Sequence, residues 1–112
     1  MKNRSKSRIV KSSLLPALLF CFFGCSENHT PKVHVVEMKQ MQFQPAEITV
    51  QKGDTVEFIN NDMVVHNIVE TSKALWSSSI LPSGKSWKVA IDKSADYICT
   101  IHPTMKGKII VK

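Results

Sequence analysis

Residues 99–105 read Cys99-Thr100-Ile101-His102-Pro103-Thr104-Met105, so that a thiol, an imidazole and a thioether recur at intervals of three. These are three donor types that a mononuclear electron-transfer copper site combines, together with one further imidazole. His66 can supply that second imidazole from a distant part of the chain. The sequence therefore predicts one copper ion, cycling between Cu(II) and Cu(I), bound by His66, Cys99, His102 and Met105.

The segments after residue 33 alternate apolar and polar residues with a period of two, which is typical of half-buried strands. The inward-facing sets are Ile48 and Val50, then Val56 and Phe58 after a turn at residues 52–54, then Trp87, Val89 and Ile91, then Tyr97, Cys99 and Ile101. At most one helical turn is expected, at residues 73–76. Seven or eight strands of this kind predict an all-β fold, an antiparallel two-sheet Greek-key sandwich, with Cys99 facing inward near the end of its strand.

The first quarter of the chain has the composition of an export signal. Residues 1–11 carry five basic residues and no acid, and residues 14–23 form a nearly unbroken apolar run that is too short to span a bilayer as a helix. The run ends at Gly24 and Cys25, which resembles a lipoprotein cleavage box, although Phe22 stands where such a box usually has Leu. We expect a signal peptide over residues 1–25 with Cys25 acylated, and ordinary cleavage or a retained anchor is the alternative.

The remaining chain divides into a polar tether at residues 26–32, with His29 as a solvated bystander, and one domain at residues 33–112. Residues 26–112 contain ten lysines, no arginine and nine acidic residues, a net charge of +1, and this balance argues against nucleic-acid binding. Cys99 is the only cysteine after Cys25. A solitary thiol in an oxidising compartment is a liability unless a metal holds it, so the cysteine count favours the same site.

Three elements of the domain occur in a recognisable order. They are the stretch from Phe43 to Phe58, the pair His66-Asn67, and the stretch from Tyr97 through Met105 to Gly107. Together they resemble the cupredoxins, and within them the amicyanin and plastocyanin group of blue copper proteins. The resemblance covers residues 33–112, and the short spacing of the ligand loop is similar to that of amicyanin.

The resemblance implies a role for each matching residue. His66, Cys99 and His102 would be the strong in-plane ligands, and Met105 the long axial one. Asn67 would join the ligand loops, with its backbone N–H donating to the thiolate. The chain departs from the family pattern at Val65 and Ile101, where relatives commonly have Pro, and at Thr104, where amicyanin has Phe. Unlike Pro, Ile101 has an N–H that can donate to Cys99 Sγ, which would raise the reduction potential.

Each residue also has an ordinary structural interpretation. A lone His is more often a capped or surface side chain, a lone Cys a small buried hydrophobe, and a lone Met core filler. The combination of His66, Cys99, His102 and Met105 indicates a metal site, whereas no one of them does so alone. Met38, Met41 and Met63 are alternative axial donors, but none of them lies on the ligand loop, and His34 lies far from it.

The function these features favour is one-electron transfer between two redox proteins, without enzyme activity, by an exported monomer. Its location would be the periplasm or cell envelope, with membrane attachment through lipid on Cys25. Partners would dock briefly on an apolar rim near His102, formed by Met41, Met63, Val64, Ile101 and Pro103.

A copper carrier or storage protein without redox cycling, and a metal-free scaffold, stay open as alternatives. A thiol catalyst is disfavoured because the sequence offers no third group to orient the imidazole beside Cys99. A copper reductase is disfavoured because its second copper centre would need more His ligands than the chain has left.

Overall fold

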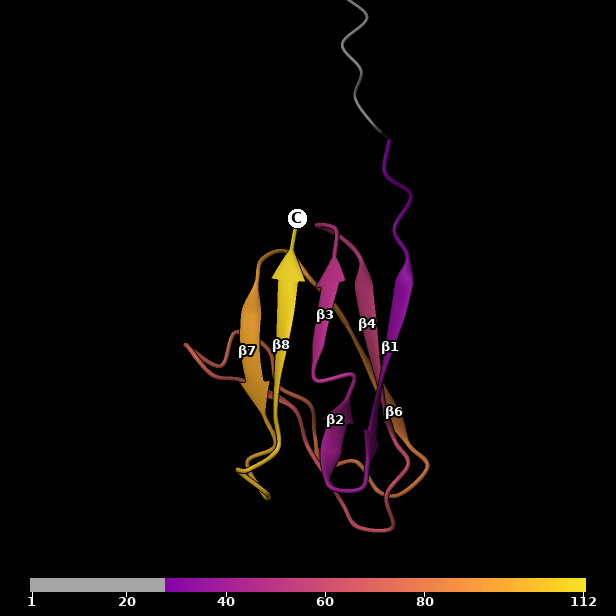
Figure 1. Cartoon of the computed structure of the whole chain (residues 1–112), viewed down its shortest axis with the longest axis vertical. Helices are drawn as coiled ribbons and strands as arrows, with labels where there is room; N and C mark the ends of the chain where they lie inside the picture. Colours follow the sequence, from indigo (N-terminus) through magenta and orange to yellow (C-terminus); the bar gives the residue numbers. More distant parts are fainter. Residues whose placement is uncertain (1–27) are drawn as a thin grey trace, which may run out of the picture.

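The computed structural model describes residues 28–112 and contains eight strands, with no helix in that range (Figure 1). The strands are β1 (Val33–Lys39), β2 (Gln42–Gln44), β3 (Glu47–Val50), β4 (Thr55–Asn60), β5 (Val69–Glu70), β6 (Ser86–Ala90), β7 (Ala95–Ile98) and β8 (Lys106–Val111). Consequently no helix within the described residues is long and apolar enough to cross a membrane. The predicted signal peptide, Cys25 and the first two tether residues lie outside the described range.

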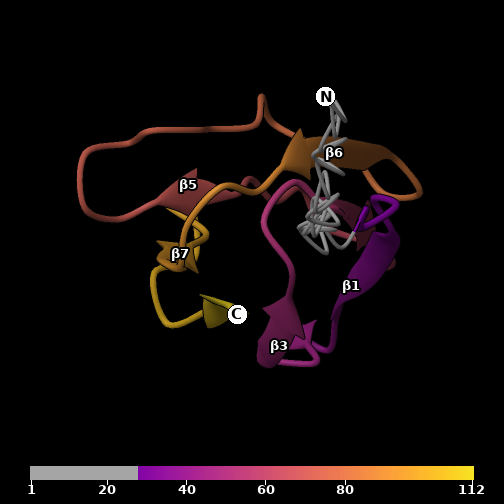
Figure 2. The same ribbon diagram turned by 90° about the horizontal axis from the view of Figure 1, so that it is seen from above.

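The strands form two four-stranded sheets that pack face to face, which confirms the predicted sandwich (Figure 2). One sheet has the order β2-β1-β4-β6 and the other β3-β8-β7-β5. The expectation of purely antiparallel sheets is wrong in detail, because β1 pairs with β4, and β3 with β8, in parallel. The reason is that the chain changes sheet between β2 and β3 and again between β3 and β4. The turn at residues 52–54 is therefore a corner between sheets.

The interior is built from the residues that the period-two pattern places inward. Those with almost no exposed surface include Val36, Met38, Val56, Phe58, Tyr97, Cys99 and Ile109, while Ile48, Trp87 and Val89 pack partly buried against them. Aromatic rings form the centre, with the ring of Tyr97 lying 4.8 Å from that of Phe43 and 5.2 Å from that of Phe58, both edge to face. The pattern ends at Cys99, since Ile101 lies in the following loop and is 40% exposed.

The two ends of the sandwich differ in what they carry. Residues 28–32 enter β1 at the end where β8 finishes and the C-terminus lies (Figure 1). The loop that follows β7, the β1–β2 turn and the loop after β4 lie at the opposite end. The predicted ligands belong to that opposite end, which we call the loop end.

The β1–β2 turn at the loop end has an unusual conformation for its sequence. It has two residues, Gln40 with φ 54° and Met41 with φ 57°, between the paired residues Lys39 and Gln42. Positive φ at both positions is the type I′ geometry, which normally selects Asn-Gly. Each non-glycine residue there costs on the order of 1–2 kcal/mol, so contacts elsewhere must stabilise this turn.

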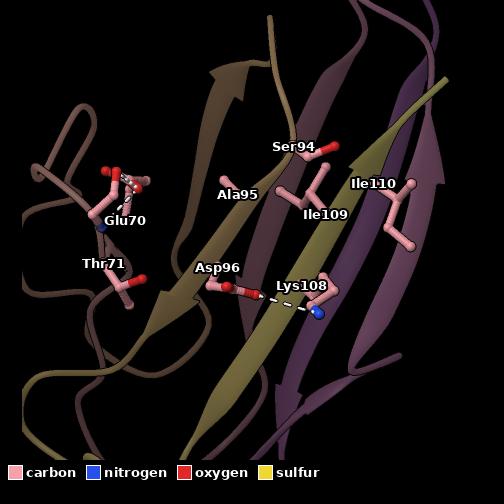
Figure 3. A pocket seen from close by; sticks show the side chains of 9 residues that line it. Glu70, Thr71, Ser94, Ala95, Asp96, Lys108, Ile109 and Ile110 are labelled. Carbon is pink, nitrogen blue, oxygen red and sulfur yellow. Dashed lines mark hydrogen bonds and ion pairs between the residues drawn. The ribbon is translucent and has the colours of Figure 1, made fainter.

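Glu70, at the end of β5, organises the loop that follows it. Its buried carboxylate accepts hydrogen bonds from the N–H groups of Ser72, Lys73 and Leu75 and from the Ser72 hydroxyl. The Ser72 hydroxyl is the largest of the effects that lower the pKa of Glu70 from 4.5 to about 2. Glu70 also borders a surface pocket along β7 and β8, where Asp96 and Lys108 form an ion pair (Figure 3).

Glu70→Gln is expected to lower the thermal midpoint at neutral pH. Because the pKa is depressed in the folded state, the stabilisation from Glu70 is complete above about pH 4.5 and is lost as the pH falls towards about 2. The difference in midpoint between the parent chain and the variant should therefore shrink over that interval. Circular dichroism melts at pH 7, 5, 3.5 and 2.5 measure it, and a constant difference would contradict this role for the charge.

Candidate metal centre

Cys99 is placed by the strand that precedes it and by the short loop that follows. It comes directly after β7 and is fully buried, and it is the one free cysteine in residues 28–112. The loop closes on itself, because Cys99 N–H donates to the Met105 carbonyl at 3.2 Å and Met105 N–H donates to the His102 carbonyl at 2.9 Å. These two bonds turn the chain back, so that His102 lies beside the thiol.

His66 reaches the same place from the loop between β4 and β5. Its backbone forms a two-way pair with Leu81, with N–O distances of 3.2 and 2.7 Å. The buried amide of Asn60 fixes the loop, since Nδ2 donates to the carbonyls of Val64 and Leu81, and Oδ1 accepts from the N–H of Asp62. The imidazole of His66 is completely buried as a result.

Three of the four predicted donors meet with the spacing of a metal site. His66 Nδ1 lies 3.1 Å from His102 Nδ1 and 3.7 Å from Cys99 Sγ, and Sγ lies 3.8 Å from His102 Nδ1. The point equidistant from these atoms in their plane is about 2.1 Å from each, which matches metal–nitrogen and metal–thiolate bonds of about 2.0–2.3 Å. Among residues 28–112, these three form the one group of His, Cys or acidic side chains so arranged.

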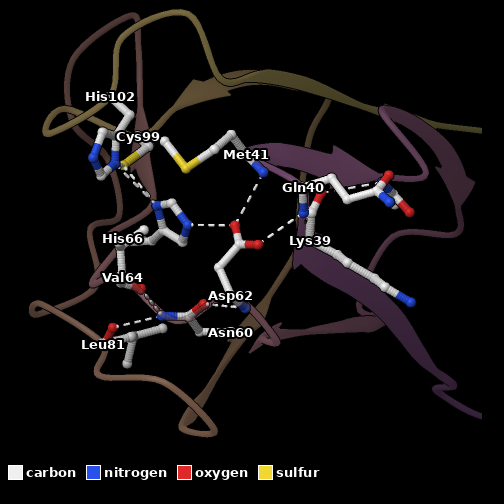
Figure 4. A network of polar contacts seen from close by, with 11 residues as sticks. Lys39, Gln40, Met41, Asn60, Asp62, Val64, His66, Leu81, Cys99 and His102 are labelled. Carbon is white, nitrogen blue, oxygen red and sulfur yellow. Dashed lines mark hydrogen bonds and ion pairs between the residues drawn. The ribbon is translucent and has the colours of Figure 1, made fainter.

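Asp62 is the residue of the site that the sequence analysis missed. Its Oδ2 lies 2.7 Å from His66 Nε2, on the side of the ring away from Cys99 (Figure 4). Because a carboxylate only accepts, this contact favours the His66 tautomer that carries its proton on Nε2 and leaves the Nδ1 lone pair facing the thiol and His102. Burial raises the pKa of Asp62, but hydrogen bonds from His66, Met41 and Gln40 outweigh burial and keep that pKa below its usual value. An Asp four residues before a candidate ligand His was the available signal.

Asn67 joins the two ligand segments, as the resemblance implied, through its side chain. Oδ1 accepts the N–H of Thr100 at 2.8 Å, and Nδ2 donates to the Thr100 hydroxyl at 2.6 Å. The residue after His66 is thereby fixed to the residue after Cys99. Within the described chain, the groups at hydrogen-bond distance from Cys99 Sγ are the two imidazoles, so N–H donation from Asn67 or Ile101 to the thiolate stays a prediction.

The methionines divide into buried and exposed ones. Met105 is 1% exposed and belongs to the same buried cluster as Cys99. Met38 is fully buried on β1, whereas Met41 and Met63 are 41% and 96% exposed. The other predicted rim residues, Val64, Ile101 and Pro103, are also exposed, and so is Val65. His102 is half-buried among them.

The remaining two histidines lie at the other end of the sandwich, where they bind Asp54. His29 Nε2 is 2.5 Å from Asp54 Oδ1, and His34 Nε2 is 2.8 Å from Oδ2. The expectation that His29 is a solvated bystander is therefore wrong, because the buried carboxylate attracts it. The N–H of Lys32 is the strongest of several donors that lower the pKa of Asp54. Residues 29–32 are thus fastened to the domain rather than forming a free tether.

Comparison with known proteins places these features in a family. A profile described as Cupredoxin-like domain matches residues 13–111. Amicyanin-alpha from Methylorubrum extorquens is 31% identical over 83 residues, covering 69% of this chain and 70% of the relative. Amicyanin from Paracoccus versutus is 27% identical over 84 residues, covering 70% of this chain and only 64% of the relative. A solved structure of a mutant of amicyanin in the Cu(I) form superimposes with a TM-score of 0.67 at 27% identity, over 71% of this chain and 82% of that one.

Proposed function

Because the chain belongs to the cupredoxin-like family, we propose that it binds one copper ion at the loop end and transfers single electrons between redox partners. The observation that carries the proposal is the triangle of His66 Nδ1, His102 Nδ1 and Cys99 Sγ, whose centre is one bond length from each atom. Two imidazoles and one thiolate are the donor set of a mononuclear electron-transfer copper site.

The proposed ligands are His66, Cys99 and His102, with Met105 as the weak fourth donor. A bound copper ion would supply the one-electron Cu(II)/Cu(I) couple. The protein would contribute a soft thiolate that suits Cu(I), imidazoles that suit both states, and a dry surrounding. The backbone pair of His66 with Leu81 and the Asn67–Thr100 bonds hold the ligands in place, so little rearrangement would accompany each electron.

Electrons would enter and leave through the edge of His102, the ligand that is least buried. Met41, Met63, Val64, Ile101 and Pro103 would form the apolar rim on which a donor or an acceptor protein docks for a short time. We propose that the protein acts as a monomer and without enzyme activity. The remaining histidines, His29 and His34, are held by Asp54 at the far end of the sandwich, which argues against a second catalytic copper centre.

The proposed location is the periplasm or cell envelope. Its support is the basic and then apolar order of the first 23 residues, followed by Gly24 and Cys25. Acylation of Cys25 would attach the protein to a membrane. Mass spectrometry of the mature N-terminus tests this part of the proposal by itself.

The central test is a copper titration of the purified protein followed by visible absorption and voltammetry. We expect saturation at one equivalent, an intense sulfur-to-copper charge-transfer band, and a reversible one-electron wave. A colourless Cu(I) complex that cannot be reversibly oxidised would instead indicate a carrier or storage protein. No stoichiometric copper, with Cys99 freely reactive to thiol reagents, would overturn the metal proposal and favour a scaffold.

A further inference from the structure

We propose that Asp62 is a positioning residue for the ligand His66 and shares its carboxylate with the β1–β2 turn. The inference rests on the proposed function, because it concerns how His66 holds the copper ion. It assigns to an acidic residue outside the ligand set an effect on both the metal affinity and the reduction potential.

The carboxylate of Asp62 makes three bonds, which join the β1–β2 turn to the loop between β4 and β5. Oδ1 accepts the N–H of Gln40 at 2.7 Å, and Oδ2 accepts the N–H of Met41 at 3.1 Å and His66 Nε2–H at 2.7 Å (Figure 4). The Asp62 side chain is 13% exposed; its bond to His66 is partly buried, whereas its two bonds to the turn lie at the surface. In residues 28–112, no other acidic side chain forms an ion pair with His66 or His102.

The bond to Nε2 has two consequences for a metal ligand. It fixes the tautomer, because the proton is held on Nε2 and Nδ1 keeps its lone pair for the metal. It also makes the imidazole a stronger donor, since the negative carboxylate stabilises positive charge on the ring. A stronger donor favours the more highly charged Cu(II) over Cu(I). Asp62 should therefore lower the reduction potential as well as tighten binding.

The bonds to Gln40 and Met41 explain how this carboxylate is held. Both residues have positive φ in a turn that normally takes Asn-Gly, and both direct their N–H groups at Asp62. The turn and the carboxylate stabilise each other, because the turn presents two donors and the carboxylate satisfies them. Asp62 thus approaches His66 from a fixed position.

An alternative role for Asp62 is to stabilise the turn alone, with its contact to His66 incidental. Glycine adopts positive φ without strain. Gln40→Gly therefore relieves the turn without touching His66. In an Asp62→Ala background, Gln40→Gly should recover the stability of the turn and leave the effect on His66 unchanged. The double variant separates the two roles.

The experiment begins with the metal-free protein, so that it does not depend on copper. Long-range ¹⁵N–¹H NMR of the His66 ring should show the Nε2–H tautomer in the parent chain and a mixture of tautomers in Asp62→Ala. Asp62→Asn can keep an oxygen on Nε2 while removing the charge, so its tautomer should be retained. If His66 keeps a single Nε2–H tautomer in Asp62→Ala, the positioning role is overturned.

Copper binding and voltammetry then follow on the same variants. Asp62→Ala should bind Cu(II) about 10–100-fold more weakly, the usual cost of losing an outer partner of a ligand. We expect the ratio of Cu(II) to Cu(I) affinity to fall about tenfold, which raises the potential by ~59 mV. Asp62→Asn should give a smaller rise in the same direction. The double variant Gln40→Gly/Asp62→Ala should keep the raised potential, and return of the parent value would overturn the proposal.

Glu70→Gln is the matched control, because Glu70 is also a nearly buried carboxylate that accepts backbone N–H groups but touches no ligand. It should lower stability and leave both the His66 tautomer and the potential unchanged. A comparable rise in its potential would contradict a specific role for Asp62. If the parent chain forms no copper centre, the proposed function fails, yet the tautomer measurement still decides whether Asp62 orients His66.

Discussion

Cys99→Ser is expected to abolish the intense visible absorption of the copper-loaded protein. The band requires a thiolate in contact with copper, and Cys99 Sγ is the sulfur that lies 3.7 Å from His66 Nδ1 and 3.8 Å from His102 Nδ1. A serine hydroxyl is neutral at pH 7 and is a poor ligand for Cu(I). Copper affinity should fall by more than the roughly 10–100-fold that loss of an outer partner costs. Absorption spectra and competitive copper titrations measure both effects.

Met63→Ala is the control for this prediction. Met63 is 96% exposed at the rim, so its removal should leave the band and the copper affinity unchanged. Persistence of the band in Cys99→Ser would mean that another thiol of the chain is the ligand. That result would contradict the proposed site.

Gly107→Ala should destabilise the domain by about 3 kcal/mol, the upper part of the range for overpacked cores. A Cβ at this position, on β8, would lie 2.2 Å from Tyr97 Cζ and 2.3 Å from its hydroxyl oxygen. The Tyr97 ring cannot move aside, because it is fully buried between Phe43 and Phe58. The two strands must therefore separate. Urea unfolding of the metal-free protein, monitored by circular dichroism, gives the free-energy difference.

Gly53→Ala is the matched comparison at the corner between β3 and β4. Gly53 has φ 91°, and a Cβ added there would meet no atom within 4 Å, so the substitution carries backbone strain without overlap. It should cost on the order of 1–2 kcal/mol. If Gly107→Ala costs no more than Gly53→Ala, the packing of Tyr97 against Gly107 is not the constraint we infer.

The burial pattern and most of the candidate metal site could be predicted because they depend on local sequence. Alternation from Ile48 to Phe58 identifies inward-facing residues whichever sheet a strand joins. The Cys99–Met105 spacing lies within a single loop, so its geometry follows from a few residues. His66 was named because such a site needs a second imidazole, and the family resemblance implied the same residue; the structure places its ring against Cys99 and His102.

The parallel strand pairs and the contacts of charged residues could not be predicted in the same way. Alternation is identical in parallel and antiparallel strands, so it does not reveal that the chain changes sheet before and after β3. The β1–β2 turn lacks the usual Asn-Gly signal, because a carboxylate more than twenty residues away stabilises it. The approach of His29 to Asp54 is equally distant in sequence. Such contacts depend on the assembled fold.

The fastening of His29 and Lys32 to Asp54 determines how the domain is oriented when it is attached to something else. The described chain leaves the sandwich at the end opposite the loops that carry His66, Cys99 and His102 (Figure 1). A bilayer, an electrode or a fused protein joined before residue 28 would therefore be attached at the end of the sandwich opposite His102. The face around His102 would point outward, towards partners that diffuse past.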